Sequence, residues 1–206
     1  MIDFRNVDCM ELMAEYDDNH FDLAIVDPPY GIDASNMQLG KGSGTESRTW
    51  ENKDWDKLPP SKEYFDELFR VSKNQIIWGA NYYEGMKPTP CWVIWDKMQE
   101  FSGAVFEMAW TSFKTPAKAF RMSRAEAYCN TNKVHPTQKP IKLYTWILAK
   151  YANEGDKILD THVGSASSLI ACHKLGFDVT GSELDEEYYS LAQQRILDET
   201  AQLSLF

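Results

Sequence analysis

The stretch between Gly155 and Glu183 constrains the fold of this chain more than any other. Its residues predict, in order, a strand at Lys157–Asp160, a loop of small residues at 164–168, a helix at Ser167–Leu175 and a strand at Asp178–Gly181. Two parallel strands need a crossover connection, usually a helix, so this order indicates a nucleotide-binding βαβ unit. Glu183 follows the second strand, at the place where a carboxylate accepts hydrogen bonds from ribose hydroxyls.

The same alternation of strand-like and helix-like segments continues through the rest of the chain. Further strands are expected at Phe4–Asp8, Leu23–Val26, Gln75–Trp78, Trp92–Trp95 and Glu107–Phe113, and further helices at Cys9–Tyr16, Ser61–Val71, Ile141–Tyr151 and Glu186–Ala201. Such alternation predicts an α/β fold, a largely parallel sheet with helices on both faces. At this length, residues 1–206 are expected to form one domain. The tryptophans expected in its core are Trp78, Trp92, Trp95 and Trp110.

The residues Asp27-Pro28-Pro29-Tyr30 directly follow the apolar run 23–26, at the carboxyl end of an expected buried strand. Ligands collect at such strand ends in open α/β sheets. Prolines lack N–H donors, so the Asp27 carboxylate and the Pro28 carbonyl are left as neighbouring acceptors for an exocyclic amino group. The Tyr30 ring offers a stacking surface for a planar base. The motif thus predicts a pocket for an aminopurine or aminopyrimidine; the other interpretation is an ordinary strand-ending turn.

The small-residue loop narrows the class of ligand. It is not Gly-x-Gly-x-x-Gly, and no Lys follows it as in a Walker motif, which argues against a dinucleotide or a triphosphate. A ligand with a ribose and no phosphate fits better, and S-adenosylmethionine is such a ligand. Its sulfonium charge is compatible with the carboxylates of Asp27, Asp160 and Glu183.

Together these motifs resemble those of the β-class, circularly permuted DNA amino-methyltransferases. In that family Asp-Pro-Pro-Tyr precedes the cofactor motif, as here, and the intervening residues Val134–Pro140 are similar to the family's His-Pro-Thr-x-Lys-Pro segment. The resemblance implies a seven-stranded, mostly parallel methyltransferase sheet, with the chain ends between its second and third strands. It implies a catalytic role for Asp27, Pro28, Pro29 and Tyr30. The implied S-adenosylmethionine contacts are Asp8, Asp27, His135, Thr137, Lys139, Asp160, His162, Gly164, Ser165 and Glu183.

Two positions depart from the family's cofactor loop, Asp-Pro-Phe-x-Gly-x-Gly. His162 replaces an aromatic residue that helps to cover the cofactor, and Ala166 replaces a glycine. Glycine is used where a ligand comes close to the backbone, so the methyl group of Ala166 is expected to crowd the methionine part of the cofactor. An imidazole can still stack, so the sequence predicts altered or weakened binding rather than loss.

The activity implied by the resemblance is methyl transfer to the exocyclic amino group of adenine in double-stranded DNA, after the base has left the stack. Adenine is preferred over cytosine because Asp-Pro-Pro-Tyr resembles the adenine enzymes, whereas Ser is commoner at its first position in enzymes that act on the cytosine amino group. The alternatives are cytosine, an RNA substrate, and a non-catalytic acidic DNA mimic on a degenerate methyltransferase fold. The biological role, as restriction partner, phage enzyme or regulator, stays open.

The net charge of −10 is unusual for a protein that neutralises DNA phosphates. Positive charge is concentrated between Lys114 and Lys142, where seven Lys and Arg residues less Glu126 give a local +6. The segment 114–133 is predicted to contact DNA, through Lys114, Lys118, Arg121, Arg124 and Lys133. The alternative is an ordinary solvated surface. Residues Thr115–Asn132 are expected to be irregular, and the Gly- and Ser-rich segment 32–58 is expected to be a mobile loop, with Trp50 and Trp55 as candidate base contacts.

The remaining composition argues against several classes of protein. The four cysteines, Cys9, Cys91, Cys129 and Cys172, form no Cys-x-x-Cys pair, so reduced thiols are expected. The histidines, His20, His135, His162 and His173, show no metal-site spacing, and no metal is expected. Without a signal peptide or membrane span the protein is expected in the cytoplasm, as a monomer or homodimer.

Overall fold

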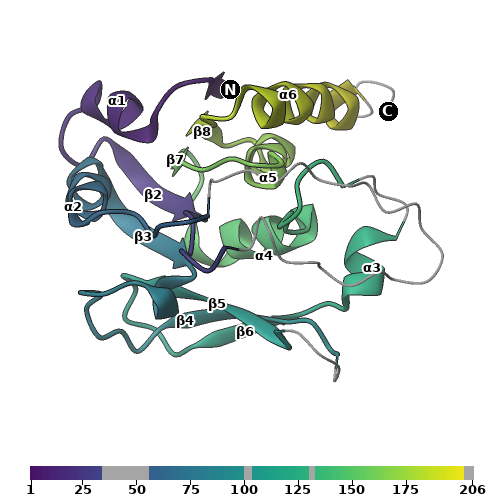
Figure 1. Ribbon diagram of the computed structural model, residues 1–206, viewed down its shortest axis with the longest axis horizontal. Helices are drawn as coiled ribbons and strands as arrows, with labels where there is room; N and C mark the ends of the chain where they lie inside the picture. Colours follow the sequence, from purple (N-terminus) through teal and green to yellow (C-terminus); the bar gives the residue numbers. More distant parts are fainter. Residues whose placement is uncertain (34–55, 100–103, 130–132, 202–206) are drawn as a thin grey trace.

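A sheet of eight strands runs through the part of the chain that the structure describes, with helices on both faces (Figure 1). This computed structural model describes residues 1–33, 56–99, 104–129 and 133–201. The strands are β1 (Ile2–Arg5), β2 (Phe21–Val26), β3 (Ser72–Trp78), β4 (Trp92–Asp96), β5 (Phe106–Thr111), β6 (Lys118–Arg121), β7 (Lys157–Asp160) and β8 (Asp178–Ser182). Their order across the sheet is β1-β8-β7-β2-β3-β5-β4-β6.

The direction of the strands determines which strand ends lie together at each edge of the sheet. Neighbouring strands from β1 to β3 in this order all pair in parallel. Strand β5 pairs antiparallel with β3 and with β4, whereas β6 pairs parallel with β4. The carboxyl ends of the parallel strands therefore share one edge, and the amino end of β5 lies at that same edge.

The central strands are apolar throughout because both of their faces are covered. Successive side chains of a strand point to opposite faces. Leu23 and Ile25 of β2 belong to the hydrophobic cluster on one face, and Ala24 and Val26 belong to the cluster on the other. All four side chains are almost completely buried, as expected for a parallel sheet between two layers of helices.

Helices from the two ends of the chain cover different faces (Figure 1). One face carries α1 (Cys9–Ala14) and α2 (Lys62–Val71), and the other carries α4 (Ile141–Tyr151), α5 (Ser167–Leu175) and α6 (Glu186–Ala201). A short 3-10 helix, η1 (Ala80–Tyr82), follows β3, and α3 (Arg124–Tyr128) follows β6. No helix in the described ranges has the length and apolar character needed to cross a membrane.

Most predicted elements are confirmed. Helices α4, α5 and α6 begin and end at the expected residues, and β8, the last of the described strands, pairs with β1, the first. Strand β1 ends earlier than predicted because Asp8 caps α1, where its carboxylate accepts a hydrogen bond from the Met10 N–H at 2.7 Å. Trp78, Trp95 and Trp110 are buried in the core, and Trp92 is half-buried.

The sheet has one strand more than the seven predicted, because β6 forms within the stretch expected to be irregular. Its residues are mostly exposed, so the strand has no alternation of apolar residues from which it could be predicted. It pairs with β4 from Val93↔Lys118 to Asp96↔Arg121, and this pairing satisfies backbone groups that an edge strand would leave open. The same stretch contains α3, capped by the Ser123 hydroxyl, which accepts from the Glu126 N–H at 3.1 Å. Most of the predicted loop 32–58, with Trp50 and Trp55, lies outside the described residues, as do residues 130–132.

Candidate active site

A cavity of about 350 Å³ opens at the carboxyl edge of the sheet, and we call it the strand-end cavity. Four neighbouring strands place residues in its wall: Asp8 follows β1, Asp27 follows β2, His162 follows β7 and Glu183 follows β8. These residues are far apart in the sequence, and the parallel topology brings them together. The two predicted motifs therefore line one cavity.

Most of the predicted cofactor residues lie in the wall of this cavity. Those that line it are Asp8, Asp27, His135, Thr137, Lys139, His162, Gly164, Ser165 and Glu183. Asp160 is not among the lining residues, because its carboxylate turns behind the loop to accept hydrogen bonds from the Ser168 hydroxyl and from the His162 N–H, the latter at 3.0 Å. Burial raises the pKa of Asp160 to about 7. This carboxylate supports the loop from the protein side.

Two carboxylates in the cavity are oriented by backbone donors. Glu183 Oε2 accepts from the Gly164 N–H at 2.9 Å, and its Oε1 accepts from the Asp185 N–H at 3.0 Å. Burial raises the pKa of Glu183. Asp8 is held by its cap of α1. A carboxylate offers about four acceptor sites, so both side chains retain sites for hydroxyl or amino donors of a ligand.

Arg195 of α6 holds the small-residue loop, a role that the sequence analysis missed. Its Nη1 donates to the Ser165 carbonyl at 2.6 Å and to Ser167 Oγ at 2.8 Å, and Ser167 Oγ donates to the Lys139 carbonyl at 2.6 Å. These bonds join α6, the loop and the segment before α4. The available signal was spacing, since Arg195 shares the buried face of α6 with Tyr188 and Ala192.

The two departures from the family loop have different consequences. Ala166 does not line the cavity, so the expected crowding of a ligand by its methyl group is wrong. The side chain is instead fully buried in the core, with a backbone φ of 62°, a left-handed conformation that costs an alanine more than a glycine. His162 does line the cavity, and Tyr64 packs edge-on against it at 5.3 Å between ring centroids. Burial lowers the pKa of His162 to about 4, so the imidazole is neutral at pH 7.

The turn after β2 presents Asp27 with both carboxylate oxygens engaged. Tyr30 OH donates to Oδ1 at 2.7 Å, and the Lys139 ammonium donates to Oδ2. The Pro28 carbonyl accepts from Tyr83 OH at 2.8 Å. Asp56 fixes the end of the turn, because its Oδ1 accepts from the Tyr30 N–H at 2.6 Å and from the Gly31 N–H at 3.1 Å.

Two charged residues that the sequence analysis missed complete this cluster. Glu107 of β5 pairs with Lys139 at 3.2 Å through Oε2 and with Lys97 at 2.6 Å through Oε1. Lys97 follows β4, and the antiparallel register places Glu107 opposite Trp95, close to the end of the hairpin. No motif marks these residues, because only the reversed direction of β5 carries its first residues to the carboxyl edge of the sheet.

The Tyr30 ring is packed on more than one side. The ring of Tyr82 stacks on it, with centroids 5.3 Å apart and an interplanar angle of 16°, and Tyr82 is 47% exposed. Gly79 lies against the same ring: a Cβ atom at Gly79 would come within 2.1 Å of Tyr30 Cε1, and the residue has a φ of 69°. This position therefore requires glycine both for its conformation and for the approach of the tyrosine.

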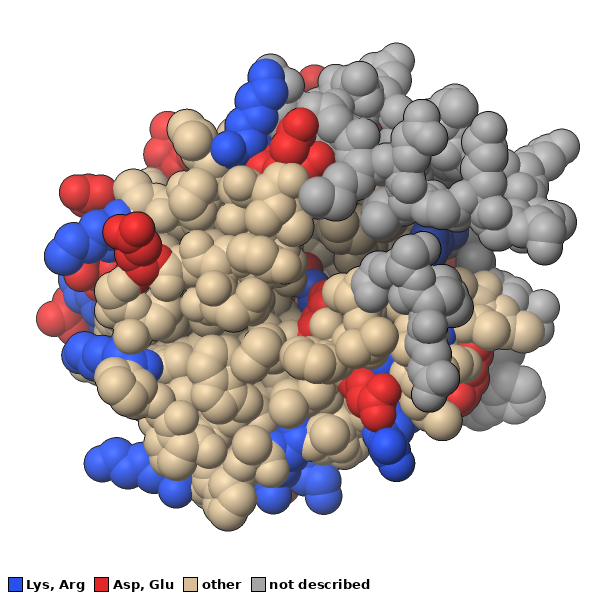
Figure 2. All heavy atoms as spheres, turned by 60° about the horizontal axis from the view of Figure 1, so that its bottom comes forward, with Lys and Arg blue, Asp and Glu red and all other residues tan. Residues whose placement is uncertain are grey.

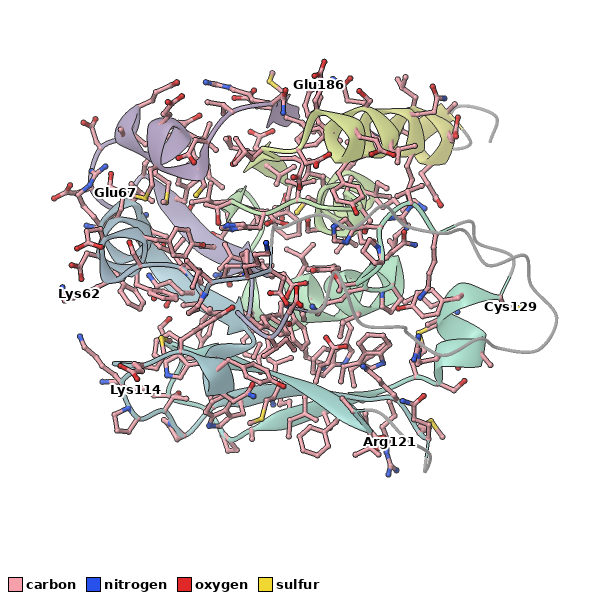
Figure 3. All side chains as sticks on the ribbon, in the orientation of Figure 1. Lys62, Glu67, Lys114, Arg121, Cys129 and Glu186 are labelled. Carbon is pink, nitrogen blue, oxygen red and sulfur yellow. The ribbon has the colours of Figure 1, made fainter. Side chains whose placement is uncertain are left out.

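The predicted DNA contacts do not form one compact cluster. Lys114 and Arg121 lie at opposite ends of the β4–β6 side of the molecule in Figure 3. Figure 2 turns this side forward and shows Lys and Arg scattered around the rim of a face without Lys, Arg, Asp or Glu over most of its centre. Lys118 is exposed, Arg124 is half-buried, and Arg121 pairs with Asp96 at 3.0 Å. Lys133 lies 3.8 Å from the centre of the Tyr128 ring, and burial lowers its pKa to about 8.

Comparisons with known proteins identify several similar chains. A family model described as DNA methylase, of the N6/N4 methyltransferase type, matches residues 95–194. The Type II methyltransferase M.HpaI of Haemophilus parainfluenzae is 28% identical over 234 residues, which cover 91% of this chain and 71% of that protein. The Type II methyltransferase M2.DpnII of Streptococcus pneumoniae is 28% identical over 143 residues, which cover 69% of this chain and 48% of that protein.

A solved structure supports the fold independently. The crystal structure of the M1.HpyAVI–SAM complex superposes with a TM-score of 0.63, covering 95% of this chain and 99% of that chain at 20% sequence identity. At that identity the likeness concerns the fold, a mostly parallel α/β methyltransferase sheet.

Among the described residues, no group of three or more His, Cys, Asp and Glu side chains is arranged to hold a metal ion.

Proposed function

We propose that this chain methylates the amino group of adenine in double-stranded DNA, because it is similar to DNA amino-methyltransferases of the N6-adenine and N4-cytosine type. The observation that carries the proposal is the shared cavity: Asp27 of the Asp-Pro-Pro-Tyr motif lines the same space as Glu183 and Gly164 of the nucleotide-binding unit. Methyl transfer requires the methyl donor and the amino group to come together, and the residues predicted to bind each of them line one cavity.

The cofactor is S-adenosylmethionine, and the residues of the strand-end cavity fit it. Glu183 offers acceptors for ribose hydroxyls, and Asp8 offers an acceptor for an adenine amino group. His162 and Val163 bring a neutral ring and an apolar side chain to the wall. Bound there, the cofactor supplies the methyl group from its sulfonium. No phosphate-binding residues are needed, in agreement with the absence of a Walker lysine from the loop.

Asp27 is the proposed catalytic residue. It would orient the amino nitrogen by accepting a hydrogen bond from it, together with the Pro28 carbonyl, which has a second lone pair beside the one that Tyr83 uses. Holding the reacting groups in line is the main catalytic contribution expected here. As the nitrogen gains positive charge, the carboxylate stabilises it through an interaction that grows toward the transition state.

The target base must leave the duplex to reach Asp27, at a cost of a few kcal/mol. Tyr30 is the proposed stacking surface. Because Tyr82 already stacks on this ring, we infer that Tyr82 moves aside when the base enters. Lys114, Lys118, Arg121, Arg124 and Lys133 remain proposed DNA contacts, of which the exposed Lys114 and Lys118 are the best placed to reach phosphates.

A labelled-methyl experiment tests this function. The protein is incubated with S-adenosylmethionine carrying a labelled methyl group and with unmethylated duplex DNA, and the DNA is then digested to nucleosides. Label is expected in N6-methyladenine, and it should be lost with Asp27→Ala. A matched control is Asp22→Ala, since Asp22 lies on β2, the strand that Asp27 follows, and pairs with Lys73 at 2.6 Å.

Other outcomes of the same experiment separate the alternatives. Label in N4-methylcytosine would change the target base and keep the site. Label in RNA but not in DNA would change the substrate class. No transfer to either nucleic acid, with cofactor still bound, would support a non-catalytic role for the methyltransferase fold.

A further inference from the structure

We propose that Lys139, Glu107 and Lys97 are positioning residues that hold the Asp27 carboxylate in a fixed orientation and set the pH at which it ionises. The inference rests on the proposed methyl transfer; it gives Lys139 a second role and adds Glu107 and Lys97, which had none so far. It concerns one continuous group of charges, which we call the buried charge cluster: Asp27, Lys139, Glu107 and Lys97.

The cluster is continuous, and its two lysines are shielded from water. Lys139 touches Asp27 Oδ2 on one side and lies 3.2 Å from Glu107 Oε2 on the other, and Glu107 Oε1 lies 2.6 Å from Lys97. The side chains of Lys139 and Lys97 are only 2% and 10% exposed. Lys139 Nζ also lies 3.2 Å from Tyr30 OH and 5.0 Å from the centre of the Trp78 ring.

Such a cluster destabilises the fold unless all its members are present. Each buried ion costs several kcal/mol of desolvation, which its partners offset only when the geometry is good. Here two anions meet two cations, so the cluster is neutral as a whole. Apolar side chains could stabilise this part of the sheet as well. The charges therefore call for a role beyond stability, and they end at the one carboxylate proposed to touch the substrate.

Glu107 prevents Lys139 from cancelling the charge of Asp27. A lone ammonium against Asp27 would neutralise the carboxylate that must stabilise positive charge on the amino nitrogen. Asp27 and Glu107 share the Lys139 ammonium, so Lys139 is not paired with Asp27 alone. Tyr30 OH holds the other oxygen of Asp27, so the plane of the carboxylate is fixed from both sides.

The pKa of Asp27 connects the cluster to a measurable quantity. Burial raises this pKa, the Lys139 charge lowers it, and the Glu107 charge raises it. The titratable groups that face Asp27 from the surrounding elements are Tyr30, Tyr64, Tyr83, Glu107, Lys139, Tyr144 and Asp160. The pKa values of these four tyrosines are raised by burial, so they stay neutral, and Asp160 is kept in each of the proposed variants.

Two substitutions should move the pH dependence of catalysis in opposite directions. Glu107→Gln removes a negative charge, which lowers the pKa of Asp27, so the acid limb of the rate profile should move to lower pH. Lys139→Gln removes a positive charge, so the limb should move to higher pH. Each shift is expected to be about one pH unit, the usual effect of a neighbouring charge. A purely structural role would shift neither limb.

The experiment is single-turnover methyl transfer to duplex DNA between pH 5 and pH 9, with saturating cofactor and DNA. Glu107→Gln should also lower the plateau rate about tenfold through looser positioning, with the Kd for S-adenosylmethionine within about twofold of wild type. Glu199→Gln is the matched control, since Glu199 pairs with Lys174 at 2.6 Å away from the cavity, and its profile should match wild type.

Further outcomes keep the two proposals separate. If wild type transfers no methyl group, the proposed function fails, whereas an active wild type with unshifted limbs in both variants overturns the role of the cluster. Shifts in the same direction overturn it too. If Glu107→Gln does not fold, Lys97→Gln carries the test: removing this cation should move the limb to higher pH, and an unchanged limb would contradict the proposal.

Discussion

Single residues next to one another in this site respond to burial in opposite ways. His162 resists protonation and Asp160 resists ionisation, although the two share a hydrogen bond and lie on one loop. Each shift follows from the same cause, the loss of water around a charged form. A neutral imidazole adds no positive charge beside the sulfonium of the cofactor. His162 can therefore take the place of the aromatic residue that the family has at this position.

His162 should make the protein less stable in acid. Its pKa is about 4 in the fold and about 6.5 in an unfolded chain, so the unfolded state binds an extra proton between these values. The free energy of unfolding therefore falls as the pH is lowered through this window, by about 2 kcal/mol between pH 7.5 and pH 5. His162→Phe should lack this loss in urea unfolding at the two pH values. Asp160 changes the pH dependence of the unfolding free energy in the opposite direction, but it is present in both the wild type and His162→Phe.

Tyr82 should compete with the target base for the Tyr30 ring. An aromatic pair contributes about 0.5–1.5 kcal/mol, so Tyr82→Ala should increase the population of flipped base by roughly twofold to tenfold. The measurement is the fluorescence of DNA with 2-aminopurine at the target position, which rises when the base leaves the stack. A decrease would show instead that Tyr82 contributes a stacking surface of its own. Tyr16→Ala, on the other edge of the sheet, serves as the control.

At the scale of elements, α6 stabilises the cofactor loop although it reaches the cavity only through Tyr188 at its first turns. Arg195→Met removes the donor for the Ser165 carbonyl and Ser167 Oγ, and buried acceptors left unpaired cost about 1–3 kcal/mol each. We expect the Kd for S-adenosylmethionine to rise roughly tenfold in calorimetric titrations. Gln194→Met, on the exposed side of the same helix, should leave the Kd unchanged.

The elements that the sequence did not predict share a physical reason. Helices α4, α5 and α6 carry their own signals, an apolar face and defined ends, and they form as expected. Strand β6 has no such signal, because it depends on the open edge of β4. The first residues of β5 reach the site only because this strand runs against its neighbours. Both features depend on pairing between strands, which no local pattern contains.

For the whole molecule, an acidic surface must still accommodate DNA. The protein has a net charge of −10, so binding should depend on a few well-placed cations. Lys114→Gln with Lys118→Gln should reduce the slope of log K against log salt by about 2, roughly one for each phosphate that a lysine no longer neutralises. The matched control is Lys62→Gln with Lys73→Gln, two exposed lysines paired with Asp66 and Asp22. An equal reduction of the slope in both would show that the attraction is a general effect of charge.

The α/β class, the order of the motifs and half of the residues that line the cavity could be predicted from the sequence. They could be predicted because strand periodicity, proline and glycine chemistry and the position of acidic residues after strands are all local properties. Three features follow only from the three-dimensional packing: Lys139 pairs with Asp27 and Glu107, Asp160 faces away from the cavity, and Ala166 lies in the core. These contacts join residues distant in the chain, and their geometry follows from strand direction and from the high cost of burying a charge without a partner.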